Sequence, residues 1–115
     1  MRRGEIVSVA FDSVRGPEAS KTRPAVVVSN DAANTTASRL NRGVITVVPV
    51  TSSTDRVYPF QVLLPAQATG LHHDSKAQAE QVRSVAVERI GRTVGVVPAR
   101  LMAELDQALR IHLSL

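Results

Sequence analysis

The chain has 115 residues, enough for a single domain, residues 1–115, that buries about two thirds of its unfolded surface. Its net charge of +4 favours an anionic partner, while an aromatic content of 3% leaves few rings on which nucleic-acid bases could stack. The absence of cysteine excludes disulfides, thiolate chemistry and cysteine-based zinc sites.

The first residues lead directly into a strand pattern, without the apolar core of a secretory signal. No apolar run approaches the ~18 residues that a membrane-spanning helix requires. We therefore expect a cytoplasmic protein with no membrane partner.

Residues 4–11 predict a first strand, with Ile6, Val7 and Val9 as its apolar positions. Residues 12–21 contain Gly-Pro and Asp/Ser, which are typical of a long surface loop. A loop of this length in a small domain is often functional and can cover a site, with simple disorder as the alternative.

Residues 25–29 form a β-branched run that predicts a strand in the middle of a sheet. Pro24 cannot donate a ladder hydrogen bond, so we expect the strand to begin after it. Arg23 would then be held at the mouth of this strand as a positioned cation.

Residues 44–50 predict a second buried strand, whose pairing Pro49 should interrupt near its end. Before this strand, Asn30 and the polar residues after it provide the cap chemistry of a short helical turn. After it, Thr51 and Ser52 open a polar loop.

The alternation in residues 60–64 predicts a further strand, with Tyr58 and Phe60 forming a packing cluster at its entry. Residues 67–76, which include two adjacent histidines, are interpreted as a solvated loop and not as a metal site, because neighbouring side chains diverge. Residues 77–85 alternate weakly and predict a strand carrying Gln81 and Arg83, although periodicity alone leaves a helix open there.

From Pro98 onward, Leu101, Leu105 and Leu109 recur at helical spacing and predict a C-terminal helix that packs by one face. Several short strands with long loops, followed by one helix, favour a mainly β fold. We expect a small curled antiparallel sheet or barrel with a C-terminal helix.

The chain has no glycine-rich phosphate loop and no nucleophile elbow around a serine. What remains is Arg23 and Thr51, each at the edge of a buried strand, where they could lie on opposite sides of a phosphate. A guanidinium and a hydroxyl suit phosphodiester cleavage without a metal or other cofactor, because they stabilise charge on the non-bridging oxygens.

Structural explanations of the same residues stay open at this point. Arg23 could form a surface ion pair with Glu18, and Thr51 could be a turn residue. Gln81 could be an ordinary polar strand position. Arg83 could pair with Glu80 or Glu88.

Six segments together carry a family resemblance that spans almost the whole chain. In chain order they are Gly4-Glu5-Ile6-Val7, Gly16-Pro17-Glu18, Lys21-Thr22-Arg23-Pro24, Pro49-Val50-Thr51-Ser52, Glu80-Gln81-Val82-Arg83-Ser84-Val85 and Glu88-Arg89-Ile90. No single segment is specific, but the ordered set resembles the MazF/PemK family of toxin endoribonucleases.

The resemblance implies an SH3-like barrel, a homodimer, cleavage of single-stranded RNA at short sequences, and inhibition by a cognate antitoxin. It implies that Arg23 and Thr51 are the catalytic pair and that Gln81 contacts RNA. It places Glu18 in the loop that covers the site. An arginine stays protonated, so we assign charge stabilisation to Arg23 and leave proton transfer open, with Glu18 the only nearby carboxylate by sequence.

Lys21, Ser52 and Arg83 are added as candidate RNA contacts. The chain departs from the family pattern at Ala86, where an Asp is usual, which puts the placing of Gln81 and Arg83 in doubt. Two other functions remain: a non-enzymatic CcdB-like toxin that binds DNA gyrase, and a module that binds RNA without cutting it.

Overall fold

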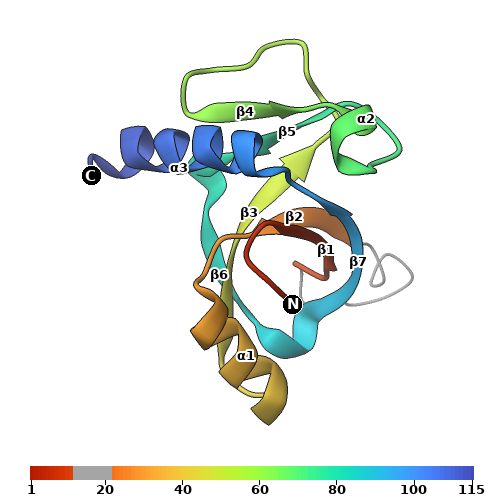
Figure 1. Ribbon diagram of the computed structural model, residues 1–115, viewed down its shortest axis with the longest axis vertical. Coiled ribbons are helices and arrows are strands. Elements are labelled where there is room, and N and C mark those ends of the chain that lie inside the picture. The colour runs from red at the N-terminus through yellow and green to blue at the C-terminus, as the bar shows by residue number, and fades with distance from the viewer. Residues whose placement is uncertain (12–21) are drawn as a thin grey trace.

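The computed structural model describes residues 1–11 and 22–115, and its main feature is one open sheet (Figure 1). The strands of this described part are β1 (Glu5–Val9), β2 (Arg23–Val27), β3 (Val44–Thr51), β4 (Gln61–Leu64), β5 (Ser75–Gln78), β6 (Arg83–Ala86) and β7 (Ile90–Val96). They follow the order β4-β5-β3-β2-β1-β7, with β6 also paired to β3, and every pairing is antiparallel. The predicted mainly β fold is confirmed, but the sheet is not closed and resembles a barrel only approximately.

Strand β3 is the centre of this sheet, because it pairs with three other strands. Along one side it pairs with β2. Along the other side it pairs with β6 as far as Val47 and with β5 from Val50. The change of partner falls at Val48 and Pro49, so the predicted interruption at Pro49 is confirmed; a proline has no N–H to offer a partner.

Both faces of the central strands are buried, which explains their nearly continuous apolar sequence. Val26 and Val48 belong to one core cluster, together with Leu101 and Leu105 of the C-terminal helix. The neighbouring positions Val27 and Val47 point to the other face and belong to a second cluster, with Val7, Val9 and Ile45. Period-2 alternation therefore divides one apolar run between two cores.

Strand β2 begins at Arg23, two residues before the predicted start. Pro24 lies opposite Ser8 of β1, whereas pairing with β3 begins only at Ala25. The missing N–H of Pro24 therefore interrupts no pairing between β2 and β3. The strand ends at Val27, earlier than predicted.

The single strand predicted for residues 77–85 is wrong. The chain forms β5, then a 3-10 helix, η2 (Ala79–Gln81), and then β6, so that Gln81 lies in a turn and not in a strand. The break is required because β5 and β6 pair with different parts of β3, on either side of its Pro49 interruption. A further 3-10 helix, η3 (Val87–Arg89), joins β6 to β7.

In the described part of the chain, three α-helices accompany the sheet: α1 (Asp31–Leu40), α2 (Ala66–Thr69) and α3 (Ala99–Leu113). The expected cap at Asn30 is confirmed, since its side chain accepts a hydrogen bond from the Ala33 N–H at 2.8 Å, but α1 is much longer than one turn. Helix α2 was missed inside the predicted loop. The predicted C-terminal helix is confirmed as α3, with Pro98 at its cap position. None of the helices in residues 1–11 and 22–115 is long and apolar enough to cross a membrane.

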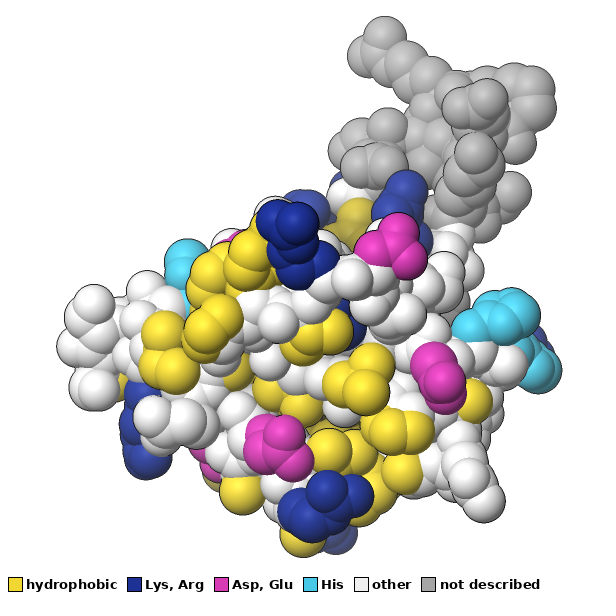
Figure 2. All heavy atoms as spheres, turned by 90° about the horizontal axis from the view of Figure 1, so that it is seen from above, with side chains coloured by type: hydrophobic (Ala, Val, Ile, Leu, Met, Phe, Trp, Pro, Cys, Tyr) yellow, Lys and Arg dark blue, Asp and Glu magenta, His cyan; other side chains and the backbone are white. Residues whose placement is uncertain are grey.

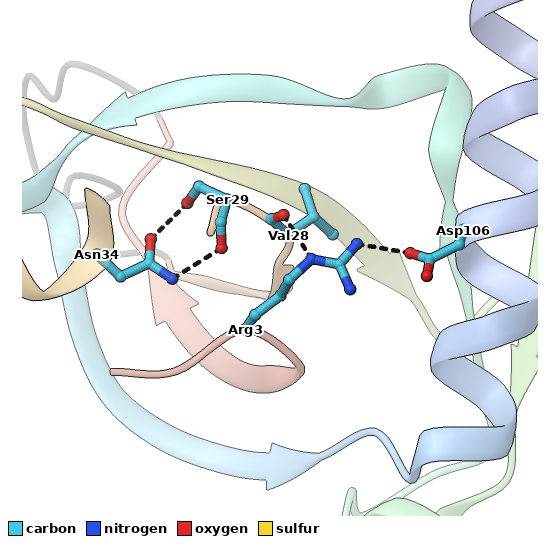
Figure 3. A network of polar contacts seen from close by, with 5 residues as sticks. All are labelled: Arg3, Val28, Ser29, Asn34 and Asp106. Atoms are coloured by element: carbon cyan, nitrogen blue, oxygen red, sulfur yellow. Dashed lines mark hydrogen bonds and ion pairs between the residues drawn. The ribbon is translucent and has the colours of Figure 1, made fainter. Parts of the chain in front are cut away.

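Arg3 connects the N-terminus to both long helices. Figure 3 shows its contacts with Val28 and with Asp106 of α3. Its backbone N–H donates to Asp31 at 2.7 Å, its Nε donates to the Val28 carbonyl at 2.9 Å, and its Nη2 lies 2.5 Å from an Asp106 oxygen. Next to it, the fully buried Asn34 donates to the Ser29 carbonyl at 2.9 Å. These bonds fix α1 and α3 to the end of β2.

We predict that Arg3→Gln lowers the free energy of unfolding by about 1–2 kcal/mol, because it removes a charge-assisted hydrogen bond to Asp106 and weakens the contact with Val28. Thermal unfolding should show a fall in Tm of roughly 5 °C. The matched control is Arg2→Gln, because Arg2 is 80% exposed and lies 3.7 Å from Asp31. Equal effects of the two substitutions would contradict the role given to Arg3.

Candidate active site

Arg23 and Thr51 line one groove with a volume of about 460 Å³. Arg23 is the first residue of β2 and Thr51 is the last residue of β3. Because these strands are antiparallel, with Ala25 opposite Pro49, the first residue of β2 and the last residue of β3 lie at the same end of the strand pair. The pairing of β2 with β3 therefore brings the two side chains to a shared site.

The groove is rich in hydroxyls and cations. Its described lining includes the hydroxyl groups of Ser8, Thr22, Thr51, Ser52 and Ser75. It also includes two guanidinium groups, Arg23 and Arg92, and two imidazoles, His72 and His73, with no Asp or Glu among the described lining residues. Such a surface attracts and hydrogen-bonds an anion.

Arg23 is exposed, and its side chain makes no hydrogen bond or ion pair with another residue of the described chain. The Thr51 hydroxyl oxygen accepts a hydrogen bond from the Ser53 N–H at 3.2 Å, which orients the oxygen and leaves its own proton available for donation. The groove thus offers an uncommitted guanidinium and an oriented hydroxyl.

The other predicted site residues are distributed differently. Ser52 lines the groove, whereas Glu18 and Lys21 lie outside the described residues. Gln81, exposed on η2, and Arg83, on β6, are not among the groove's described lining residues.

Arg83 makes a contact that sequence reasoning missed. Its guanidinium lies 5.1 Å from the centre of the Phe11 ring, a cation–π distance. The alternative ion pairs with Glu80 or Glu88 are not found among the described residues. Glu80 instead accepts a hydrogen bond from the Gln61 side chain at 2.7 Å.

Tyr58 and Phe60 stack in parallel with ring centres 5.4 Å apart, and Arg56 lies over the Tyr58 ring at 5.8 Å. Tyr58 therefore contacts both Phe60 and Arg56, as in the packing cluster expected there. Figure 2 looks onto the side of β4 and α2 and shows hydrophobic side chains gathered there, with Lys and Arg at the margin. The exposed apolar residues of β4 and the segment before it are Val57, Tyr58 and Leu63.

Sequence reasoning assigned no role to His72, His73 or Arg92, although all three line the groove. Gly70 was the one local signal: it closes α2 with a φ of 86°, a conformation that glycine adopts readily, and so starts a defined turn towards His72. Nothing in the local sequence indicated that the Arg92 side chain faces the groove, because its orientation depends on the irregular pairing between β1 and β7.

A family model described as "PemK-like, MazF-like toxin of type II toxin-antitoxin system" matches residues 2–113. The chain belongs to this toxin family. The match covers every strand and helix of the described structure and leaves out only Met1 and residues 114–115. It agrees with the resemblance carried by the sequence motifs.

Relatives support this membership. Endoribonuclease MazF9 of Mycobacterium tuberculosis is 64% identical over 115 residues, covering 100% of this chain and 98% of the relative. The crystal structure of MazF from Deinococcus radiodurans is 30% identical with a TM-score of 0.77, covering 100% of this chain and 97% of that one. A MazE-MazF crystal structure from the same organism is 29% identical with a TM-score of 0.74 and the same coverages.

We predict that Gly95→Ala destabilises the wall of the groove that carries His72 and His73. A Cβ at this position would lie 2.7 Å from the backbone carbonyl oxygen of Thr69, at the start of that loop. The overpacking should cost about 1–3 kcal/mol. Hydrogen exchange should show faster opening of residues 69–75. The control is Val96→Ala, next in the strand and 53% exposed, which should change neither stability nor exchange appreciably.

Proposed function

We propose that this chain, an endoribonuclease of the MazF-like toxin family, cuts single-stranded RNA at short sequences without a metal and thereby inhibits translation and growth. In this proposal the ribose 2′-hydroxyl attacks the adjacent phosphate. The observation that carries it is the common groove of Arg23 and Thr51, whose described lining holds cations and hydroxyls but no carboxylate.

The attack places negative charge on the non-bridging oxygens of the phosphate. The Arg23 guanidinium, which has no other ionic partner among the described residues, can donate two parallel hydrogen bonds to those oxygens. The Thr51 hydroxyl can donate a further one. A preorganised donor of this kind contributes about 3–4 kcal/mol to lowering a reaction barrier.

Proton transfer needs a group other than Arg23, because a guanidinium remains protonated. Glu18 is the candidate for this role because it is the only nearby carboxylate by sequence, and the family resemblance assigns it to the loop that covers the site. Lys21, Ser52, Gln81 and Arg83 are proposed to bind the RNA strand around the cut phosphate. Ser52 is the one among these four that lines the groove in the described structure.

A cognate antitoxin and a second copy of the chain are the proposed protein partners. Structures of MazE-MazF, at 28% and 29% identity to this chain, support an antitoxin partner. We propose that a flexible, acidic segment of the antitoxin covers the cationic groove and excludes RNA from it. We propose that the protein and these partners are located in the cytoplasm.

We predict that Arg23→Ala lowers kcat for RNA cleavage by about 100- to 1000-fold in buffer containing EDTA, and that Thr51→Val lowers it by roughly tenfold or more. The reason is the loss of donors to the charged phosphate oxygens. Cleavage is measured on a long RNA by mapping the new 5′ ends. Arg100→Gln is the matched control, because Arg100 is a 77% exposed residue of α3, pairs only with Glu104 among the described residues, and is absent from the groove lining.

If Arg23→Ala cuts RNA as fast as wild type, the proposed active site is wrong. A different outcome is also informative: if the Arg23 and Thr51 variants stay toxic in cells and co-purify with DNA gyrase, the gyrase-binding function is correct instead.

We further predict that a single 2′-deoxy substitution at the cut nucleotide abolishes cleavage while leaving binding nearly unchanged. The attacking oxygen is then missing, but the phosphates remain. Products of the unmodified RNA should carry a 5′-hydroxyl on one fragment and a cyclic or 3′-phosphate on the other, as mass spectrometry can determine. Cleavage of the 2′-deoxy RNA at the same bond would mean that water, and not the ribose, attacks.

A further inference from the structure

The part of the groove formed by β7 owes its shape to irregular pairing between β1 and β7. Val7 lies opposite Thr93 and Val9 opposite Ile90, so Gly91 and Arg92 together face the single residue Ser8. A second register shift, between Ile6 and Val7, leaves Val94 as another extra residue of β7. Both extra side chains, Arg92 and Val94, line the groove. Bulges redirect side chains in this way and are frequent beside active sites.

Gly91 allows the first bulge. A Cβ on this residue would lie 3.3 Å from the Ser8 carbonyl oxygen, closer than most real contacts. With glycine there, β7 can come close to β1 while Arg92 is directed into the groove. Arg92 is exposed and makes no hydrogen bond or ion pair with another residue of the described chain, so its donors are available to a ligand.

His72 and His73 stand on a loop that is held at both ends. At one end the Thr69 hydroxyl oxygen accepts from the Leu71 N–H at 3.3 Å. At the other end the Ser75 hydroxyl donates to the His73 carbonyl at 2.9 Å, and Asp74 accepts from the Ala66 N–H at 2.8 Å. The imidazoles are therefore exposed groups on an anchored turn, as a preorganised binding site requires.

Arg23 and Thr51 already provide what one phosphate needs, yet the groove contains a second guanidinium, on β7, and two imidazoles, on the loop after α2. A single-stranded RNA carries one phosphate per nucleotide, so a strand that places one phosphate at Arg23 must direct its neighbour along the groove. The Arg92 guanidinium and the two imidazoles are hydrogen-bonding groups that can bind this neighbouring phosphate.

We propose that Arg92, together with His72 and His73, forms a subsite for the phosphate that neighbours the cut phosphate. This inference rests on the proposed RNA cleavage and assigns these three residues to binding, not to the chemical step. Loss of the subsite should weaken RNA binding without changing which bond is cut.

The experiment compares wild type with Arg92→Gln and with the double variant His72→Asn/His73→Asn. KM for an RNA oligonucleotide containing the mapped cut site should rise about tenfold in each, with kcat within about twofold of wild type. Fluorescence anisotropy with the same RNA, made uncleavable by one 2′-deoxy nucleotide, is followed from about 50 to 200 mM NaCl. The slope of the log association constant against log salt should become less negative by about 0.7 for Arg92→Gln, the value for one phosphate on a single strand.

A second probe identifies the phosphate itself. RNA with one neutral methylphosphonate beside the cut bond, on either side in turn, should bind wild type about tenfold more weakly at one of the two positions. Arg92→Gln should lose clearly less affinity than wild type on that substitution, because the guanidinium that contacts this phosphate is already absent and only the imidazoles remain. Arg100→Gln, with the same change of charge on α3, should behave as wild type in every assay.

The inference is overturned if Arg92→Gln loses as much RNA-binding affinity as wild type at both methylphosphonate positions. It is also overturned if Arg92→Gln lowers kcat with KM unchanged. Thermal unfolding confirms that each variant is folded, as expected for exposed side chains. If wild type does not cut RNA at all, the proposed function fails. If wild type cuts, Arg23→Ala does not, and Arg92→Gln is unaffected, only the subsite fails.

Discussion

The antiparallel pairing of β2 with β3 is the constraint on which the rest of the molecule depends. Ala25 opposite Pro49 determines that the N-terminal end of β2 and the C-terminal end of β3 share one edge of the sheet. Burial of Val26 and Val48 on one face and Val27 and Val47 on the other fixes this register, because a shift by one residue would exchange the two cores. The position of Arg23 relative to Thr51 is thus maintained by hydrophobic packing at some distance from the groove.

Much of this central frame could be predicted from the sequence, for a simple physical reason. A strand with both faces buried must be apolar throughout, so residues 25–29 and 44–50 were recognisable without knowledge of their neighbours. Pro49 likewise marked the break in pairing, because the missing N–H is a local property. Arg23 and Thr51 could be proposed because Arg23 lies just before the first of these runs, separated by Pro24, and Thr51 directly follows the second.

The part of the groove formed by β7 and the loop after α2 could not be predicted, because it depends on pairings between distant segments. The bulges that direct Arg92 and Val94 into the groove exist only as a mismatch between β1 and β7, and neither strand shows it alone. The strand predicted for residues 77–85 failed for a similar reason: η2 is required by the positions of β5 and β6 along β3. His72 and His73 looked like solvated loop residues because the bonds that anchor their turn involve Ala66 and Thr69.

The family resemblance implies an Asp where this chain has Ala86, and the structure shows what holds this turn without a carboxylate. The Val87 N–H donates to the Gly43 carbonyl at 3.0 Å, and Ala86 lies opposite Val44 in the sheet. One step further, Arg89 and Ala10 are joined by two hydrogen bonds, from the Ala10 N–H at 3.0 Å and from the Arg89 Nη1 at 2.9 Å. Because Arg83 also lies over Phe11, the last described residues before Glu18 are attached to β6 and η3. The placing of Arg83 therefore depends on backbone pairing and on a ring contact, and does not require the missing carboxylate.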